Sequence, residues 1–198
     1  MRVLAIIGFT FWSGVLSFPA FPSYPQTHAA QTTHWKKYRN EKFDFTVEYP
    51  TGWKLSQGFD GSGATITPGG TRFPKSTVLG VGGWVVQPSS GDESHPKTLD
   101  KDLASLIDAI AEPPLEGHNA RVVKQHKVVI DGLDGLDVTI NYDDKAGKLW
   151  MRRELLLHSA QDAVAYHVSI AYLAKEAAPA DSIFARVVST FHILGPPL

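Results

Sequence analysis

Residues 35–53 read WKKYRNEKFDFTVEYPTGW, and this stretch decides the fold. Between Phe43 and Tyr49 every second side chain is apolar, and the side chains between them are polar. An alternation of period two places all the apolar side chains on one face of an extended chain. The pattern therefore predicts a β-strand over residues 42–49, with one buried face and one face in water.

Turn signals follow this strand directly. Pro50 and Gly52 interrupt a strand, because proline lacks the backbone N–H and glycine adopts turn conformations. We therefore expect a hairpin whose second strand begins near Trp53. The polar residues 31–38, which precede the stretch, are expected to be loose.

The rest of the chain contains strand and helix patterns in a definite order. Strands are expected over 64–67, 77–87, 121–130, 136–142, 149–158 and 164–172, and helices over 99–111 and from Pro179 onward. The last four strands follow one another through short loops, which favours an antiparallel meander. The order predicts an α+β fold, with an antiparallel β-sheet of about six to seven strands flanked by helices.

The N-terminal residues 1–30 have the composition of a secretory signal peptide. Arg2 precedes a short uncharged apolar run over residues 3–16, and small residues suit cleavage after Ala29 or Ala30. A run of this length is shorter than the ~20 residues of a spanning helix. An uncleaved N-terminal anchor is the alternative. After cleavage we expect no integral membrane segment.

A chain of 198 residues suggests one domain or at most two small ones, and we interpret residues 31–198 as a single domain. The net charge of −1 offers no basic surplus for a phosphate backbone, so no nucleic acid is expected as a partner. The absence of cysteine from the sequence excludes disulfides, thiol catalysis and iron–sulfur clusters. The domain must therefore be stabilised by its apolar core.

Residues 38–45 and 49–53 together resemble the opening of the PsbP/Mog superfamily, where a (Y/F)xNxxxGFSxxYPxGW-like stretch forms the first hairpin. The position that the family usually fills with glycine is shifted here and holds Asp44, next to Phe43. The order of the later elements is similar too. The resemblance covers roughly residues 35–193.

This resemblance implies a PsbP/Mog-like α/β/α sandwich. Members of the superfamily mostly bind other proteins, and its bacterial relatives are exported. The N-terminus lacks the Ser- and Arg-rich pattern of a plastid transit peptide. We therefore expect an exported bacterial relative that is secreted or periplasmic and binds a protein partner.

Four residues are candidate metal ligands. His158 and His167 lie on neighbouring expected strands and could approach each other across residues 159–163. Asp131 and Asp134 offer oxygen ligands that suit calcium. The alternatives without a metal ion are histidines on a solvent-facing strand and aspartates that form an Asp-Gly turn.

Two tryptophans are candidates for partner binding. Trp84 and Trp150 lie on expected strands, and interfaces are rich in tryptophan. Core packing is the commoner use of such residues. The strand that contains Trp150 has apolar residues on both faces, so it is expected to be central and covered on both sides.

No catalytic motif accompanies these residues. Ser62 lies between two glycines but outside the frame of a nucleophile elbow, and Glu154 is interpreted as a member of a cross-strand ion pair. We expect no enzyme activity and no cofactor. The leading hypothesis is a non-catalytic accessory domain that binds a protein or stabilises an envelope complex. The alternatives are a small-ligand or calcium-ion carrier and, third, a hydrolase.

Overall fold

The structure is a computed structural model that describes residues 34–69, 76–86, 99–112, 115–159 and 164–195. The predicted signal peptide, residues 1–30, lies outside the described residues. None of the helices in the described part of the chain is both long and apolar enough to cross a membrane.

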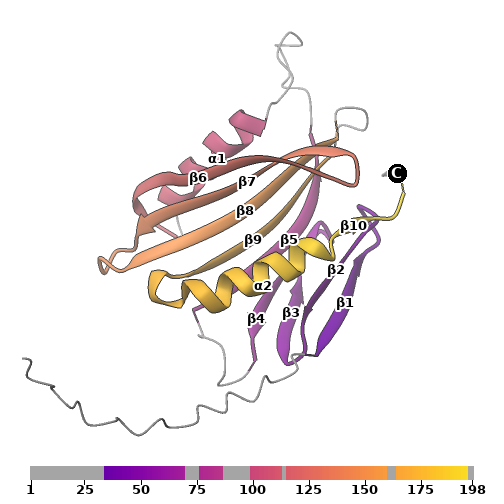
Figure 1. The fold of residues 1–198 in the computed structure, drawn as a ribbon, viewed down its shortest axis with the longest axis horizontal. Helices are drawn as coiled ribbons and strands as arrows, with labels where there is room; N and C mark the ends of the chain where they lie inside the picture. The colour runs from indigo at the N-terminus through magenta and orange to yellow at the C-terminus, as the bar shows by residue number, and fades with distance from the viewer. Residues whose placement is uncertain (1–33, 70–75, 87–98, 113–114, 160–163, 196–198) are drawn as a thin grey trace, which may run out of the picture. The chain divides into compact units, whose positions relative to one another are not determined.

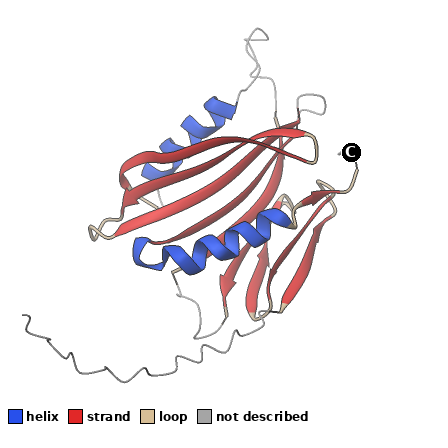
Figure 2. Ribbon diagram, in the orientation of Figure 1, coloured by secondary structure: helices blue, strands red, loops and turns tan. Residues whose placement is uncertain are grey.

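The described residues form two antiparallel sheets and two α-helices (Figures 1 and 2). The larger sheet contains, in spatial order, β3 (Trp53–Gln57), β4 (Gly63–Pro68), β5 (Val78–Val85), β9 (Val164–Leu173), β8 (Leu149–Ser159), β7 (Leu133–Asp143) and β6 (His118–Ile130). The smaller sheet has the order β1 (Trp35–Asn40), β2 (Phe45–Pro50) and β10 (His192–Ile193). The helices are α1 (Leu99–Ala111) and α2 (Ala177–Ser189), and a short 3-10 helix (Ala174–Glu176) precedes α2.

Most of the predicted architecture is confirmed. The α+β class, the antiparallel pairing and the meander β6-β7-β8-β9 are all present, and α1 has the predicted bounds. The meander is possible because each connection is short. Asp131 and Gly132 join β6 to β7, and both have positive φ, at 50° and 81°, as a two-residue hairpin turn requires.

The predicted hairpin between β2 and β3 is wrong. β2 pairs with β1 on one side and with β10 on the other, whereas β3 pairs with β4 in the larger sheet. The turn at Gly52, which has a φ of +93°, therefore passes the chain from one sheet to the other. The segment expected to be loose, residues 31–38, contains the first four residues of β1, a strand in which only Tyr38 and Asn40 are buried. This strand was not predicted because its composition is mostly polar.

The two helices contribute to different core clusters. Leu103 and Ile110 of α1 pack with Leu136, Val138 and other residues from one face of the larger sheet. The α2 side chains Ile183, Phe184 and Val187 pack with Leu155, Leu157 and Val168 of β8 and β9, with Phe45 of the smaller sheet, and with Phe191, which lies between α2 and β10. Successive side chains on a strand point to opposite faces, so the helices lie against opposite faces of the larger sheet.

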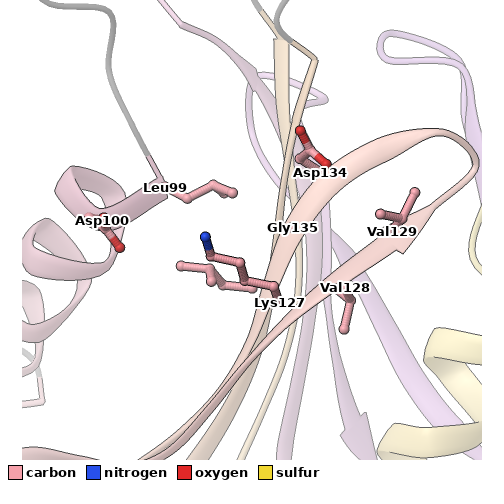
Figure 3. A pocket seen from close by; sticks show the side chains of 8 residues that line it. Leu99, Asp100, Lys127, Val128, Val129, Asp134 and Gly135 are labelled. Atoms are coloured by element: carbon pink, nitrogen blue, oxygen red, sulfur yellow. The ribbon is translucent and has the colours of Figure 1, made fainter.

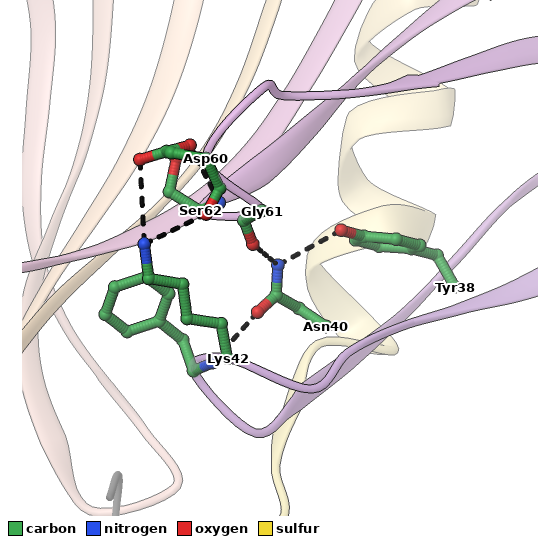
Figure 4. A network of polar contacts seen from close by, with 7 residues as sticks. Tyr38, Asn40, Lys42, Asp60, Gly61 and Ser62 are labelled. Carbon is green, nitrogen blue, oxygen red and sulfur yellow. Dashed lines mark hydrogen bonds and ion pairs between the residues drawn. The ribbon is translucent and has the colours of Figure 1, made fainter.

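A buried asparagine joins the two sheets (Figure 4). Asn40 is 1% exposed, and its Nδ2 donates hydrogen bonds to Oη of Tyr38 at 3.1 Å and to the carbonyl oxygen of Gly61 at 2.9 Å. Its Oδ1 accepts a hydrogen bond from the backbone N–H of Phe43 at 2.9 Å. Near it, Nζ of Lys42 donates to the carbonyl oxygen of Asp60 at 3.0 Å. The β1–β2 loop is thereby fixed to the β3–β4 turn.

Replacing Asn40 with alanine should lower the free energy of unfolding by about 2 kcal/mol, because buried groups would lose their partners. Equilibrium urea denaturation measures this change. Lys42→Ala is the matched control, since it removes only the contacts of an exposed side chain next to the same network and should cost less than about 0.5 kcal/mol. Equal losses for the two variants would contradict the bridging role of Asn40.

Candidate functional site

A groove lies on the face of the larger sheet that also carries α1. That helix contacts β6 and β8, and the groove is formed farther along the same face, where β5 and β9 meet β8. Its volume is about 480 Å³. We call it the β5–β9 groove and define it by Val78, Gly80, Trp150, Arg152, His167 and Ser169.

A buried carboxylate organises the polar end of this groove. Glu154 of β8 is 1% exposed, and its two oxygens have different partners. Oε2 is 2.7 Å from Nε of Arg152 on the same strand, and Oε1 is 2.9 Å from Nδ1 of His167 on β9. An ionised carboxylate only accepts hydrogen bonds, so this contact requires the proton on Nδ1 of His167.

The charge state of Glu154 follows from these contacts. Burial raises the pKa of its carboxyl, but the Arg152 guanidinium and the hydrogen bond from His167 outweigh burial and hold that pKa below its usual value. Glu154 is therefore ionised at neutral pH. It fixes the Arg152 and His167 side chains at the groove wall.

Both predicted partner-binding tryptophans are positioned by polar residues of this region. The indole of Trp84 meets the ring of His167 edge-on, with 5.7 Å between ring centroids. Trp150 stacks on Tyr142 at 6.4 Å, and its Nε1 donates a hydrogen bond to Oδ2 of Asp144 at 3.0 Å. The pKa of Asp144 is lowered by the backbone N–H of Lys148 first and by Trp150 second.

The glycines of β5 make room for the side chains of β9. A Cβ atom on Gly80 would lie 2.7 Å from Oγ of Ser169, and one on Gly82 would lie 2.9 Å from Nε2 of His167. Both distances are shorter than real contacts of a Cβ atom. Glycine at these two positions therefore leaves space for the β9 side chains that line the groove.

The structure does not gather the four predicted metal ligands into one site. Nε2 of His158 is 3.0 Å from Oδ2 of Asp102 in α1, and His167 contacts Glu154, so each histidine has its own carboxylate. Oδ2 of Asp131 accepts a hydrogen bond from the backbone N–H of Ile193 at 2.9 Å. Within the described ranges, no group of three or more His, Asp or Glu residues could hold a metal ion.

Asp134 is brought next to one of the other three candidates, His158. It lies opposite His158 across the β7–β8 pairing and lines a hollow beside the start of α1.

Sequence reasoning placed Trp84 and Trp150 correctly on strands and interpreted Glu154 as a member of a cross-strand ion pair, but it did not identify the two partners of this carboxylate. The Arg152 contact has a local signal, because residues two apart on a strand share a face. The His167 contact has none, since it depends on the register that sets Leu156 opposite His167. The contacts of Tyr142 and Asp144 with Trp150 were not predicted either.

Solved structures with a similar fold are known. The structure of cyanobacterial PsbP (CyanoP) from Synechocystis sp. PCC 6803 has 13% sequence identity and a TM-score of 0.58, and the match covers 91% of this chain and 99% of that chain. The Ran-binding protein Mog1p of Saccharomyces cerevisiae has 13% identity and a TM-score of 0.56, over 82% of this chain and 97% of that chain.

The sequence matches no protein-family model and no curated protein. The likeness to the solved structures therefore concerns the fold. It agrees with the motif over residues 35–53, which resembles the opening of the same superfamily. The chain has a PsbP/Mog-like fold.

Proposed function

We propose that this chain is an exported, non-catalytic accessory domain that binds a protein partner through the β5–β9 groove. The observation that carries the proposal is a groove wall whose aromatic and charged side chains are already held in place. The predicted signal peptide supports a secreted or periplasmic location. Mog1p, a similar structure, is a Ran-binding protein, which supports a binding role for a domain of this fold.

The chemistry of the groove suits docking. Val78 and Leu115 line it and are 38% and 39% exposed, and they offer apolar area beside the half-buried Trp150. Tryptophan and arginine are the residues that most often dominate binding energy at interfaces. Because Trp150 is fixed by Tyr142 and Asp144, little side-chain entropy would be lost when a partner binds.

The same contacts favour a non-catalytic role. A general acid or base must reach a reacting group with a free atom. Both oxygens of Glu154 are already engaged, and the side chain is buried. The carboxylate is therefore suited to holding Arg152 and His167 in place.

Replacing Trp150 with alanine should weaken capture of the partner by about tenfold or more, as expected for a central interface aromatic. The measurement is affinity capture with tagged protein from envelope extracts of the source organism, with captured proteins quantified by mass spectrometry. Phe59→Ala is the control, because Phe59 is fully exposed and is not among the groove residues. Thermal unfolding of each variant separates lost binding from lost folding.

A wild-type protein that captures no specific partner would contradict the proposal. So would a Trp150→Ala variant that is folded and captures the partner as well as wild type. Export is tested separately, by the mass of the secreted protein. A chain that begins at Ala30 or Gln31 is expected after cleavage.

A small-ligand carrier is the second candidate. The volume of the groove, about 480 Å³, lies within the usual range of ligand pockets, roughly 300–1,000 Å³. Native mass spectrometry of purified protein checks this reading. A copurified mass that Trp150→Ala loses would favour the carrier over the docking domain.

A further inference from the structure

The strand β6 forms an edge of the larger sheet and is rich in basic residues. Its residues 118–130 read HNARVVKQHKVVI, with five basic side chains and no acidic one, in a chain whose net charge is −1. Arg121, Lys124, His126 and Lys127 are all exposed. None of the ion pairs found in the described ranges gives Arg121, Lys124 or Lys127 a carboxylate partner.

The backbone of β6 offers hydrogen-bonding groups along its outer side. The two-residue turn makes Ile130 and Leu133 a hydrogen-bonded pair, and in an antiparallel ladder such pairs alternate with pairs that do not bond each other. The N–H and C=O groups of Gln125, Lys127 and Val129 therefore point away from β7. An exposed row of this kind is a template for another strand.

A hollow adjoins this edge on the α1 face (Figure 3). It has a volume of about 560 Å³, and its lining includes apolar residues, the cation of Lys127 and two carboxylates: Leu99, Asp100, Lys127, Val129, Asp134 and Leu136. Val129 is 69% exposed. Side chains of β6 alternate between the faces, so Lys124 and His126 lie on the opposite face, with Ile130.

We propose that β6 accepts an extended acidic segment of a protein partner as an added strand. The added strand bonds to the backbone of Gln125, Lys127 and Val129. Its acidic side chains lie on the face of Lys124 and His126, and its apolar side chains face the hollow. This inference rests on the proposed function, because it supplies the kind of partner that such an accessory domain would bind.

Charge selects this occupant over a second copy of the chain. Pairing β6 with β6 would set the charges of Arg121, Lys124 and Lys127 against those of a second copy, and like charges across a strand pair are destabilising. Edge lysines normally keep strands apart in this way. An acidic strand reverses the sign of that interaction and gains backbone hydrogen bonds as well.

The test uses a fluorescein-labelled ten-residue peptide that alternates valine and glutamate, with anisotropy as the readout. One control peptide alternates valine with lysine. The other is the acidic peptide with proline in place of its central valines. Of the three peptides, we expect only the acidic one to bind. Gln125→Pro should weaken its binding by about tenfold, because it removes one outward N–H without touching the β6–β7 ladder.

Gln125→Ala is the matched control and should bind like wild type. Equal binding of Gln125→Pro and Gln125→Ala would overturn strand addition, since charge attraction alone would then suffice. If Gln125→Pro does not fold, equal binding of wild type to the acidic and proline peptides overturns it instead. Absence of binding by wild type does so as well.

The envelope capture described above separates this inference from the proposed function. Strand addition at β6 is refuted, and the accessory role is left intact, by two results together. The acidic peptide fails to bind wild type, and a Lys124→Glu/Lys127→Glu variant still captures the partner. A wild type that binds the peptide but captures nothing refutes the accessory role alone.

Discussion

Replacing Phe45 with alanine should lower the free energy of unfolding by about 3–5 kcal/mol, the usual cost of deleting a buried ring from a core. Phe45 has no exposed surface and lies in β2, where the two sheets meet. Its ring stacks on Phe191 at 5.3 Å and meets Tyr38 and Tyr166 edge-on, each at 6.0 Å. The cavity would therefore open between strands of both sheets.

Equilibrium urea denaturation, followed by tryptophan fluorescence, measures this loss. Phe45→Leu should recover about half of it, because the smaller side chain fills part of the cavity. Phe59→Ala is the control and should change the free energy by less than about 0.5 kcal/mol, since Phe59 is fully exposed. A loss below about 1 kcal/mol for Phe45→Ala would mean that the ring does not join the sheets.

The sequence allowed most of the larger sheet to be predicted, because its signals are local. Strand β7 alternates Leu136, Val138 and Ile140 with polar residues, and α1 repeats leucine and isoleucine at helical spacing. The meander has short connections, so each strand pairs with the next one along the chain. Under those conditions, pattern and order together determine topology.

The separation into two sheets was not predictable by the same means. The turn at Pro50 and Gly52 is compatible with a hairpin or with a crossing to another sheet. The choice depends on distant partners, since β10 pairs with β2 from the other end of the chain.

The resemblance to the PsbP/Mog superfamily adds information at Asp44, which stands where the family usually has glycine. Asp44 has a φ of +45°, so the position before Phe45 has the left-handed backbone that glycine favours.

The candidate site was predictable only in part, for a related reason. Tryptophans on strands are visible in a sequence, but their environment depends on register. Glu154 was expected to form a cross-strand ion pair, and its contact with His167 is of that kind. Its contact with Arg152 runs along one strand. The aligned rows of β5, β8 and β9 become a groove only once all three strands are in place.

Replacing Glu154 with glutamine should lower the free energy of unfolding by about 3 kcal/mol at neutral pH, because it leaves a mostly buried guanidinium without a counter-charge. The Arg152 side chain is 18% exposed and Glu154 is 1% exposed, so water does little to replace the lost interaction. Glutamine keeps the size of the side chain. The loss therefore reports charge and hydrogen bonding more than packing.

Glu48→Gln is the matched control. It makes the same chemical change in an exposed pair, where Glu48 lies 2.8 Å from Arg186 and the two side chains are 33% and 52% exposed. Exposed pairs contribute about 0–1 kcal/mol, so this variant should unfold almost like wild type. Equal losses for the two variants would show that the Glu154 cluster contributes no more than a surface pair.

The pH dependence supplies a second check with a definite sign. The pKa of Glu154 is lower in the folded protein than in the unfolded chain, whose reference value is 4.5. Its stabilising contribution is therefore complete above the unfolded value and is lost as the pH falls through the folded value. Wild type should exceed Glu154→Gln in stability at about pH 7, and the difference should shrink at about pH 3. A difference that grows on acidification would mean that burial, and not Arg152 and His167, controls this carboxyl.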